Sequence, residues 1–144
     1  MGGTNPDNFL NSIGRKKDGS GGDILLWKRK AERYLVESGV PYTIIHPGGL
    51  VDEDSSKREL VVGVNDEIMK DPAFASGGTR SVARADVARV CKAALGSASA
   101  TGVALDLVSK KLGDGVPTKD ASTVFTAPGK YTYESAATDP PSIF

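Results

Sequence analysis

The sequence predicts an α/β fold, because twice along the chain an amphipathic helix ends at a glycine and is followed by an apolar, β-branched strand. The first such pair is a helix at residues 23–38 and a strand at residues 42–46. The second is a helix at residues 85–95 and a strand at residues 102–108. A helix that leads through a short connection into a buried strand is half of a β-α-β unit, so we expect a mainly parallel sheet.

The composition is that of an ordinary globular protein, and it argues against several classes of function. The chain has 144 residues, of which 39% are hydrophobic and 25% charged, and its formal net charge is zero. No overall basic field is present for nucleic acid, and no apolar run approaches the roughly 20 residues that span a bilayer. The single cysteine allows no internal disulfide and indicates a reducing compartment. We expect a cytoplasmic protein without membrane or nucleic-acid partners, or a plastid protein if an N-terminal segment is missing.

The helix at residues 23–38 carries the most informative side chain of the N-terminal third. Asp23 precedes the helix as an expected N-cap, and Gly39 follows at the position favoured for a left-handed stop. Lys28 lies on the flank of the apolar stripe, where a lysine either extends to water or reaches a polar partner near the core. The stripe comprises Ile24, Trp27, Ala31, Tyr34 and Leu35, with Arg29, Arg33 and Glu37 facing the other way.

The strand at residues 42–46 ends at a segment almost bare of side chains. Its sequence, YTIIH, is apolar on both faces, which favours a central strand covered by helices. Pro47, Gly48 and Gly49 follow at the carboxyl end, which is where open parallel sheets bind ligands. Glycines there permit positive φ angles and a close approach of ligand to backbone. Two interpretations stay open: an ordinary loop, or a place where a flat or phosphorylated ligand lies against the chain.

The remaining sequence predicts shorter elements between glycine- and proline-rich turns. The helix at residues 85–95 has its apolar stripe at Val87, Val90, Cys91, Ala94 and Leu95. Around it we expect a short turn at residues 8–13, a β-hairpin at residues 57–69, a short strand at residues 77–83, a short helix at residues 117–125 capped by Thr118, and a poorly ordered tail at residues 127–144.

Few residues suit catalysis or metal binding on their own. His46 is the only histidine and no Gly-x-Ser-x-Gly turn precedes a helix, so the sequence does not favour a Ser-His-Asp triad. Cys91 falls on an apolar stripe, which predicts a core position rather than a reactive thiol. The carboxylates at residues 52–54 fit a solvated loop, and nowhere do side chains have the spacing of metal ligands. The basic run at residues 28–33 is divided around the helix axis, which disfavours a nucleic-acid patch.

The order of these features resembles the second half of the atypical short-chain dehydrogenases/reductases, which are NAD(P)-binding Rossmann-fold proteins. The segment WKRKAERYLVESGVPYTIIHPGGL is similar to a family stretch that reads Lys-x-x-Ala-Glu, then a glycine, then a strand ending in Arg-Pro-Gly. SVARADVARVCKAAL resembles the downstream family motif Arg-x-Asp-Val-Ala. MGGTNP together with GVPTKD is similar to a plant group of small NAD(P)-binding proteins. The similar segments extend over residues 1–125.

The resemblance implies a cofactor and a set of site residues. The implied cofactor is NADP or NAD, with NADP favoured, and the implied reaction is hydride transfer to a small-molecule substrate that the sequence does not identify. Lys28 matches the active-site lysine, which hydrogen-bonds the nicotinamide ribose, and His46 stands where the family has arginine. The turn that passes the nicotinamide ring is matched by Pro47, Gly48, Gly49 and Leu50.

Two departures from the family pattern bear on activity. The catalytic tyrosine, which is the general acid in carbonyl reduction, is matched by Ile24. The chain also contains no Gly-x-Gly-x-x-Gly turn to hold a pyrophosphate at a helix N-terminus. We therefore expect residues 1–126 to be the C-terminal part of a Rossmann-like domain with a doubly wound parallel sheet and a small hairpin insertion, in a fragment that lacks the pyrophosphate-binding half. The alternative is a non-catalytic nucleotide-sensing or protein-interaction module of the same fold.

Overall fold

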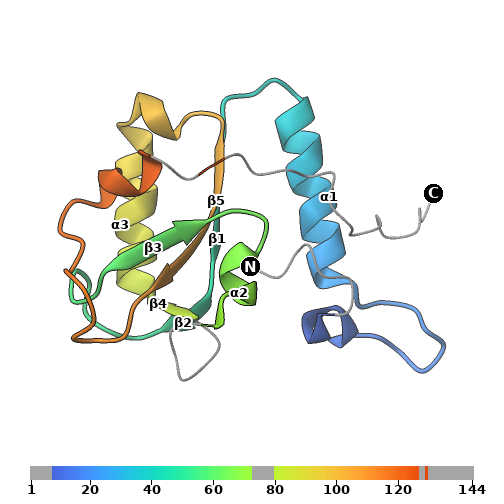
Figure 1. The fold of residues 1–144 in the computed structure, drawn as a ribbon. Helices are drawn as coiled ribbons and strands as arrows, with labels where there is room; N and C mark the ends of the chain where they lie inside the picture. The colour runs from blue at the N-terminus through green and yellow to red at the C-terminus, as the bar shows by residue number, and fades with distance from the viewer. Residues whose placement is uncertain (1–7, 73–79, 127–128, 130–144) are drawn as a thin grey trace. The chain divides into compact units, whose positions relative to one another are not determined.

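The computed structural model describes residues 8–72, 80–126 and 129. These residues divide into two compact units, one formed by residues 41–126 with Gly129 and the other by residues 8–40. The larger unit contains the strands, and the smaller unit contains the first long helix (Figure 1). The expected tail at residues 127–144 lies outside the described residues, apart from Gly129.

A three-stranded sheet in the order β1-β5-β3 forms the centre of the larger unit. β1 (Thr43–Pro47) lies parallel to β5 (Val103–Ser109), and β3 (Leu60–Gly63) lies antiparallel on the other side of β5. A separate pair joins β2 (Gly49–Val51) to β4 (Ser81–Ala83) in parallel. The predicted α/β fold with mainly parallel pairing is confirmed.

Helices and 3-10 turns occur in both units. In the described residues, no helix has the length and hydropathy needed to cross a bilayer. Both long predicted helices are confirmed, together with the short turn, the short strand and the short helix expected around them. The helices are α1 (Ile24–Glu37), α2 (Glu67–Lys70) and α3 (Arg84–Leu95), with 3-10 turns η1 (Phe9–Ser12), η3 (Ala98–Ala100) and η4 (Ala121–Phe125).

The core of the larger unit forms where α3 and η4 pack against β5. Successive side chains of a strand point to opposite faces, so Leu105 and Leu107 share one face, and neither has exposed surface. Val90 of α3 and Phe125 of η4 belong to the same buried cluster. The full cluster comprises Val82, Val90, Ala100, Leu105, Leu107, Ala121, Val124 and Phe125. β5 is therefore the central strand of the described sheet, whereas the sequence pattern pointed to the strand at residues 42–46, which is wrong.

The hairpin expected at residues 57–69 is also wrong. β3 forms its first arm but pairs with β5, and the second arm is the single helical turn α2. Asn65 and Asp66 both adopt left-handed backbone conformations, with φ angles of 55° and 58°. The Asp66 amide donates to Asp106 Oδ2 at 2.8 Å, and this contact with a strand 40 residues away redirects the chain into α2.

The buried face of α1 differs from the predicted stripe. Leu25, Leu26 and Arg29 are buried, whereas Ile24 and Tyr34 of the predicted stripe are exposed. The cause lies at the start of the helix, where the Asn11 side chain of η1 accepts a hydrogen bond from the Leu25 amide at 2.9 Å and η1 packs on the first turn.

Two predicted helix caps are wrong as well. Asp23 has a left-handed backbone and makes no side-chain cap, because its carboxylate pairs with Arg15. η4 is capped by Asp120, which accepts from the Ser122 amide at 2.9 Å. Hydrogen bonds from the Ser122 amide and hydroxyl lower the pKa of Asp120. Thr118, the expected cap, instead accepts a hydrogen bond from the Leu60 amide of β3.

The position of Cys91 differs from its predicted place in the core. Cys91 is exposed on α3, because the neighbouring Val90 carries the fully buried position of that helix. The predicted stripe is therefore right only in part: Val90 is buried and Val87 and Ala94 pack against the core, but Cys91 and Leu95 are exposed.

The connection between β1 and β2 is extended rather than looped. The Gly48 amide donates to the Leu107 carbonyl at 2.9 Å, and the Gly49 amide donates to the Arg80 carbonyl at 2.8 Å. Neither glycine is among the described residues with positive φ, so the expected left-handed turn is absent from this stretch of the described chain. The backbone runs straight from one strand into the next.

Gly48 is required by packing inside the protein. A Cβ atom at this position would lie 2.9 Å from Val108 Cγ1 and 3.0 Å from the Arg80 carbonyl carbon. The close approach is therefore made by the chain's own backbone. At Gly49 the nearest atoms to a Cβ would be 3.7 Å away or farther, and the residue is exposed.

We predict that Gly48→Ala destabilises the protein by about 1–3 kcal/mol, because the added methyl group overpacks a fixed backbone contact. Gly49→Ala, the matched control, should change the free energy of unfolding by less than about 0.5 kcal/mol. Urea denaturation of both variants measures the difference. Equal stability of the two variants would contradict the packing role of Gly48.

Candidate functional site

Five of the six predicted site residues are consecutive in the sequence, at the end of β1 and the start of β2. They differ in how far they are exposed. Pro47 ends β1, Gly48 is closed in by Arg80 and Val108, and Gly49 begins β2. Gly49 is exposed, and Leu50 is 44% exposed. The part of this segment open to a ligand is therefore Gly49 with Leu50.

His46 faces a buried carboxylate. It lies opposite Asp106 in the register of β1 and β5, and its Nδ1 atom is 3.4 Å from Asp106 Oδ1. The His46 side chain is 13% exposed and that of Asp106 is fully buried. The second carboxylate oxygen, Oδ2, accepts the Asp66 amide. A buried carboxylate needs such partners, because leaving water costs several kcal/mol when a charge is unpaired. Asp106 Oδ1 thus lies beside the His46 ring without a hydrogen bond to it.

Lys28 belongs to α1, in the other compact unit. Its side chain is exposed, so of the two alternatives for a lysine beside an apolar stripe, the structure shows the one that extends to water. One turn earlier lies Ile24, which is 38% exposed. Lys30 on the same helix lies over the Trp27 ring, 5.2 Å from its centroid, which is within cation–π range.

Sequence reasoning missed two buried acidic residues. Asp106 has a visible signal, since it is a charged residue in the middle of an apolar strand. Asp86 is 1% exposed and joins Arg89 at 2.6 Å in the first turns of α3. Asp86 is the aspartate of the Arg-x-Asp-Val-Ala motif. The spacing of that motif does not reveal the hydrogen-bond partners of its carboxylate.

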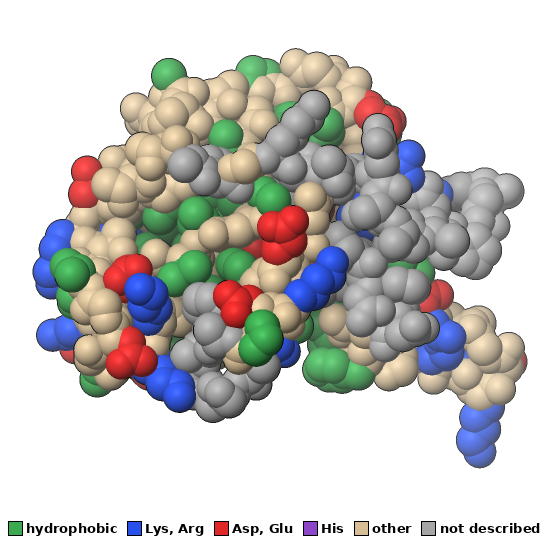
Figure 2. Space-filling model, viewed as in Figure 1, with side chains coloured by type: hydrophobic (Ala, Val, Ile, Leu, Met, Phe, Trp, Pro, Cys, Tyr) green, Lys and Arg blue, Asp and Glu red, His purple; other side chains and the backbone are tan. Residues whose placement is uncertain are grey.

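Charges of both signs are mixed on the molecular surface. On the face seen in Figure 2, basic and acidic side chains are interspersed. Among the ion pairs of the described residues, Arg58 pairs with Glu53 and Arg84 with Asp52, each 2.6 Å apart. Such a surface has no extended field of one sign on that face.

The residues at the end of β1 fit one end of a nicotinamide dinucleotide. Gly49 and Leu50 are exposed, and the absence of a side chain at Gly49 would let a flat ring approach the backbone there. The amides of Gly48 and Gly49 are already bonded within the protein, so they are not donors for a ligand. The pyrophosphate end has no matching glycine-rich turn in this sequence. The fit therefore covers the nicotinamide end alone.

Comparison with known proteins agrees with this partial fit. The chain is 52% identical to an uncharacterised chloroplastic protein of Arabidopsis thaliana and 45% identical to sanguinarine reductase of Eschscholzia californica, in each case over 126 residues and 88% of this chain. The aligned region covers 35% of the first relative and 42% of the second, so the chain spans about two fifths of their length. Over 36 residues it is 63% identical to the chloroplastic Protein TIC 62 of Pisum sativum, a match that covers 25% of this chain and 7% of that protein.

A protein-family model gives the broader assignment. The model described as NAD(P)H-binding matches residues 5–98, which include α1, the carboxyl end of β1 and α3. The match covers more than half of the chain, and together with the relatives above it shows that this chain belongs to the NAD(P)H-binding family.

Proposed function

We propose that the chain forms the nicotinamide-binding part of an NAD(P)H-dependent reductase. The observation that carries the proposal is the exposed Gly49–Leu50 stretch at the carboxyl end of β1, which is the edge where α/β sheets bind ligands. Membership of the NAD(P)H-binding family and similarity to a reductase support it. When bound, the cofactor supplies a hydride to the substrate.

Each site residue has a distinct part in this proposal. Gly49 and Leu50 line the passage of the nicotinamide ring, and Pro47 ends the strand that carries them. His46, whose ring lies beside Asp106, supplies an imidazole at the end of the same strand. Lys28 supplies a charged hydrogen-bond donor for the cofactor from an exposed helical position. Gly48 contributes by letting the Arg80 backbone pass close to the strand.

We also propose that residues 1–126 are the C-terminal part of a longer cofactor-binding domain. The absence of a glycine-rich turn from the sequence and the span of two fifths of its relatives support this. Transcripts of the gene should then encode, upstream, a strand followed by a glycine-rich turn and a helix. An in-frame stop codon directly upstream in every transcript would refute the proposal. The chloroplastic relatives favour a plastid location for the whole protein.

A second candidate function is a non-catalytic nucleotide sensor, which Ile24 favours. An isoleucine cannot donate a proton, and reduction of a ketone needs a proton at oxygen as well as a hydride at carbon. An acceptor that is a quaternary iminium ion needs only the hydride. The choice of acceptor therefore distinguishes a reductase adapted to the missing acid from a protein that binds the cofactor without turnover.

We predict that the protein translated from the full transcript oxidises NADPH with sanguinarine or another quaternary iminium acceptor faster than with simple ketones. The reason is that only the ketone reaction requires an acid at the position of Ile24. Absorbance at the NADPH band measures both rates. Cofactor binding without turnover across iminium, quinone and carbonyl acceptors would support the sensor instead.

A matched pair of lysine variants tests the site in the same assay. Lys28→Ala should raise the KM for NADPH by about tenfold, the effect of one lost charged hydrogen bond. Lys30→Ala removes an equal charge from the same helix but one that lies over Trp27, and should leave the KM unchanged. If both substitutions raise the KM equally, the effect comes from the loss of a positive charge on the helix, and a specific hydrogen bond from Lys28 to the cofactor is contradicted.

A further inference from the structure

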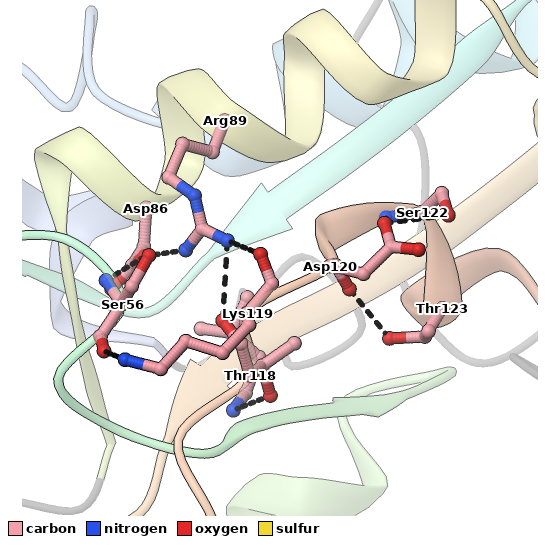
Figure 3. Close-up of polar contacts among 9 residues, drawn as sticks. Ser56, Asp86, Arg89, Thr118, Lys119, Asp120, Ser122 and Thr123 are labelled. Atoms are coloured by element: carbon pink, nitrogen blue, oxygen red, sulfur yellow. Dashed lines mark hydrogen bonds and ion pairs between the residues drawn. The ribbon is translucent and has the colours of Figure 1, made fainter.

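A strained residue in the loop after β2 is held by contacts on both sides. Ser56 has a φ angle of 60°, a left-handed conformation that is unfavourable for a residue with a Cβ atom. Its amide donates to Asp86 Oδ1 at 2.9 Å, and its carbonyl accepts from Lys119 Nζ at 2.9 Å. Both backbone polar groups of Ser56 are therefore fixed by side chains from other parts of the chain (Figure 3).

These contacts close into a ring around Asp86. Arg89 Nη1 donates to Asp86 Oδ1 at 2.6 Å, and Arg89 Nη2 donates to the carbonyls of Thr118 and Lys119. Figure 3 shows Arg89 between the Asp86 carboxylate and the Thr118–Lys119 backbone. The ring thus runs from Ser56 through Asp86 and Arg89 to Lys119, and back to Ser56. Because Asp86 is 1% exposed, water does not compete strongly for its oxygens.

Two ion pairs tie the same loop near its ends, but they differ in kind from the ring. Arg58 binds Glu53 through two hydrogen bonds of 2.6 and 2.8 Å, which brings the ends of the loop together. Asp52 pairs with Arg84 at the surface, with both side chains more than half exposed. Surface pairs of that kind contribute little. Within the loop, the backbone of Ser56 itself is held by Asp86 and Lys119.

The loop, residues 52–58, occupies a position suited to ligand contact. It follows Val51 at the carboxyl end of β2, the strand that contains Gly49 and Leu50. Ligands of parallel α/β sheets bind beyond the carboxyl ends of the strands. The ring engages the backbone of Ser56, so it sets the course of the loop and not the contacts of one side chain. A strained residue that is held from both sides is typical of functional sites.

We propose that Asp86 is a positioning residue: through Ser56 it holds the loop at residues 52–58 in the shape that contacts the acceptor substrate of the reductase. This inference rests on the proposed reductase function. A purely structural alternative exists, because an acidic side chain in the first turn of α3 also interacts favourably with the helix dipole. The two roles differ in whether the effect of Asp86 passes through Ser56.

The first part of the test needs no activity. In Asp86→Ala, hydrogen exchange of the Ser56 amide should accelerate by about tenfold or more, because its acceptor is gone. Asp52→Ala, which removes an exposed carboxylate from the same loop, is the matched control and should leave that exchange rate unchanged. Unchanged exchange in Asp86→Ala would overturn the proposal.

The second part tests whether Asp86 acts through Ser56. Asp86→Ala should raise the KM for the acceptor by about tenfold with little change in kcat, because only the contact surface for the substrate is lost. Adding Ser56→Gly should recover much of that loss, because glycine adopts the left-handed conformation without steric cost. A helix-stabilising role would not be rescued at Ser56, so a double variant no better than Asp86→Ala would overturn the proposal.

A second pair of variants covers the case in which Asp86→Ala does not fold. Ser56→Val should raise the same KM, because a β-branched residue opposes the left-handed conformation, while Ser56→Gly should not. Equal KM values would overturn the proposal. If the unaltered protein shows no NADPH-dependent turnover, the proposed function fails, whereas the exchange measurement still decides whether Asp86 holds the loop.

Discussion

The placement of β5 between β1 and β3 is the constraint on which the rest of the larger unit depends. On one face of β5, Leu105 and Leu107 pack with residues of α3 and η4 and form the hydrophobic core. On the other face, Asp106 lies beside His46 and holds the turn into α2, and Val108 packs against Gly48. One strand therefore determines both the hydrophobic core and the course of the candidate site. The loss of a residue at the centre of β5 would disturb packing and site together.

This arrangement changes the meaning of the two glycines after β1. Gly48 is explained by the Arg80 backbone, which passes too close for a side chain, so it is not in itself evidence of a ligand. At Gly49 no neighbouring atom would exclude a side chain, and the residue is exposed to solvent. The functional proposal therefore depends on Gly49 and Leu50, together with the His46 ring that lies beside Asp106. A site that would hold only the nicotinamide end of the cofactor agrees with a chain that spans about two fifths of the length of these relatives.

Local patterns predicted the elements, while contacts distant in sequence determined the details. The long helices could be identified from their periodicity and their terminal glycines, because those signals lie within a few residues. The hairpin could not be excluded, since α2 depends on a hydrogen bond from Asp66 to a residue 40 positions away. The buried face of α1 depends on Asn11, 14 positions before Leu25. Asp86 was missed for the same reason, because its partner Ser56 lies 30 positions earlier.

The central claim is that the carboxyl end of β1 receives the nicotinamide end of the cofactor, and an NMR titration of the isotope-labelled protein with NADPH tests it most directly. The account predicts that the amide signals of Gly49 and Leu50 shift with saturable dependence on NADPH. The amide of Asp120, the N-cap of the 3-10 turn η4 that packs on α3, should not shift. Shifts confined to residues away from 46–51, or none at millimolar NADPH, would contradict the account.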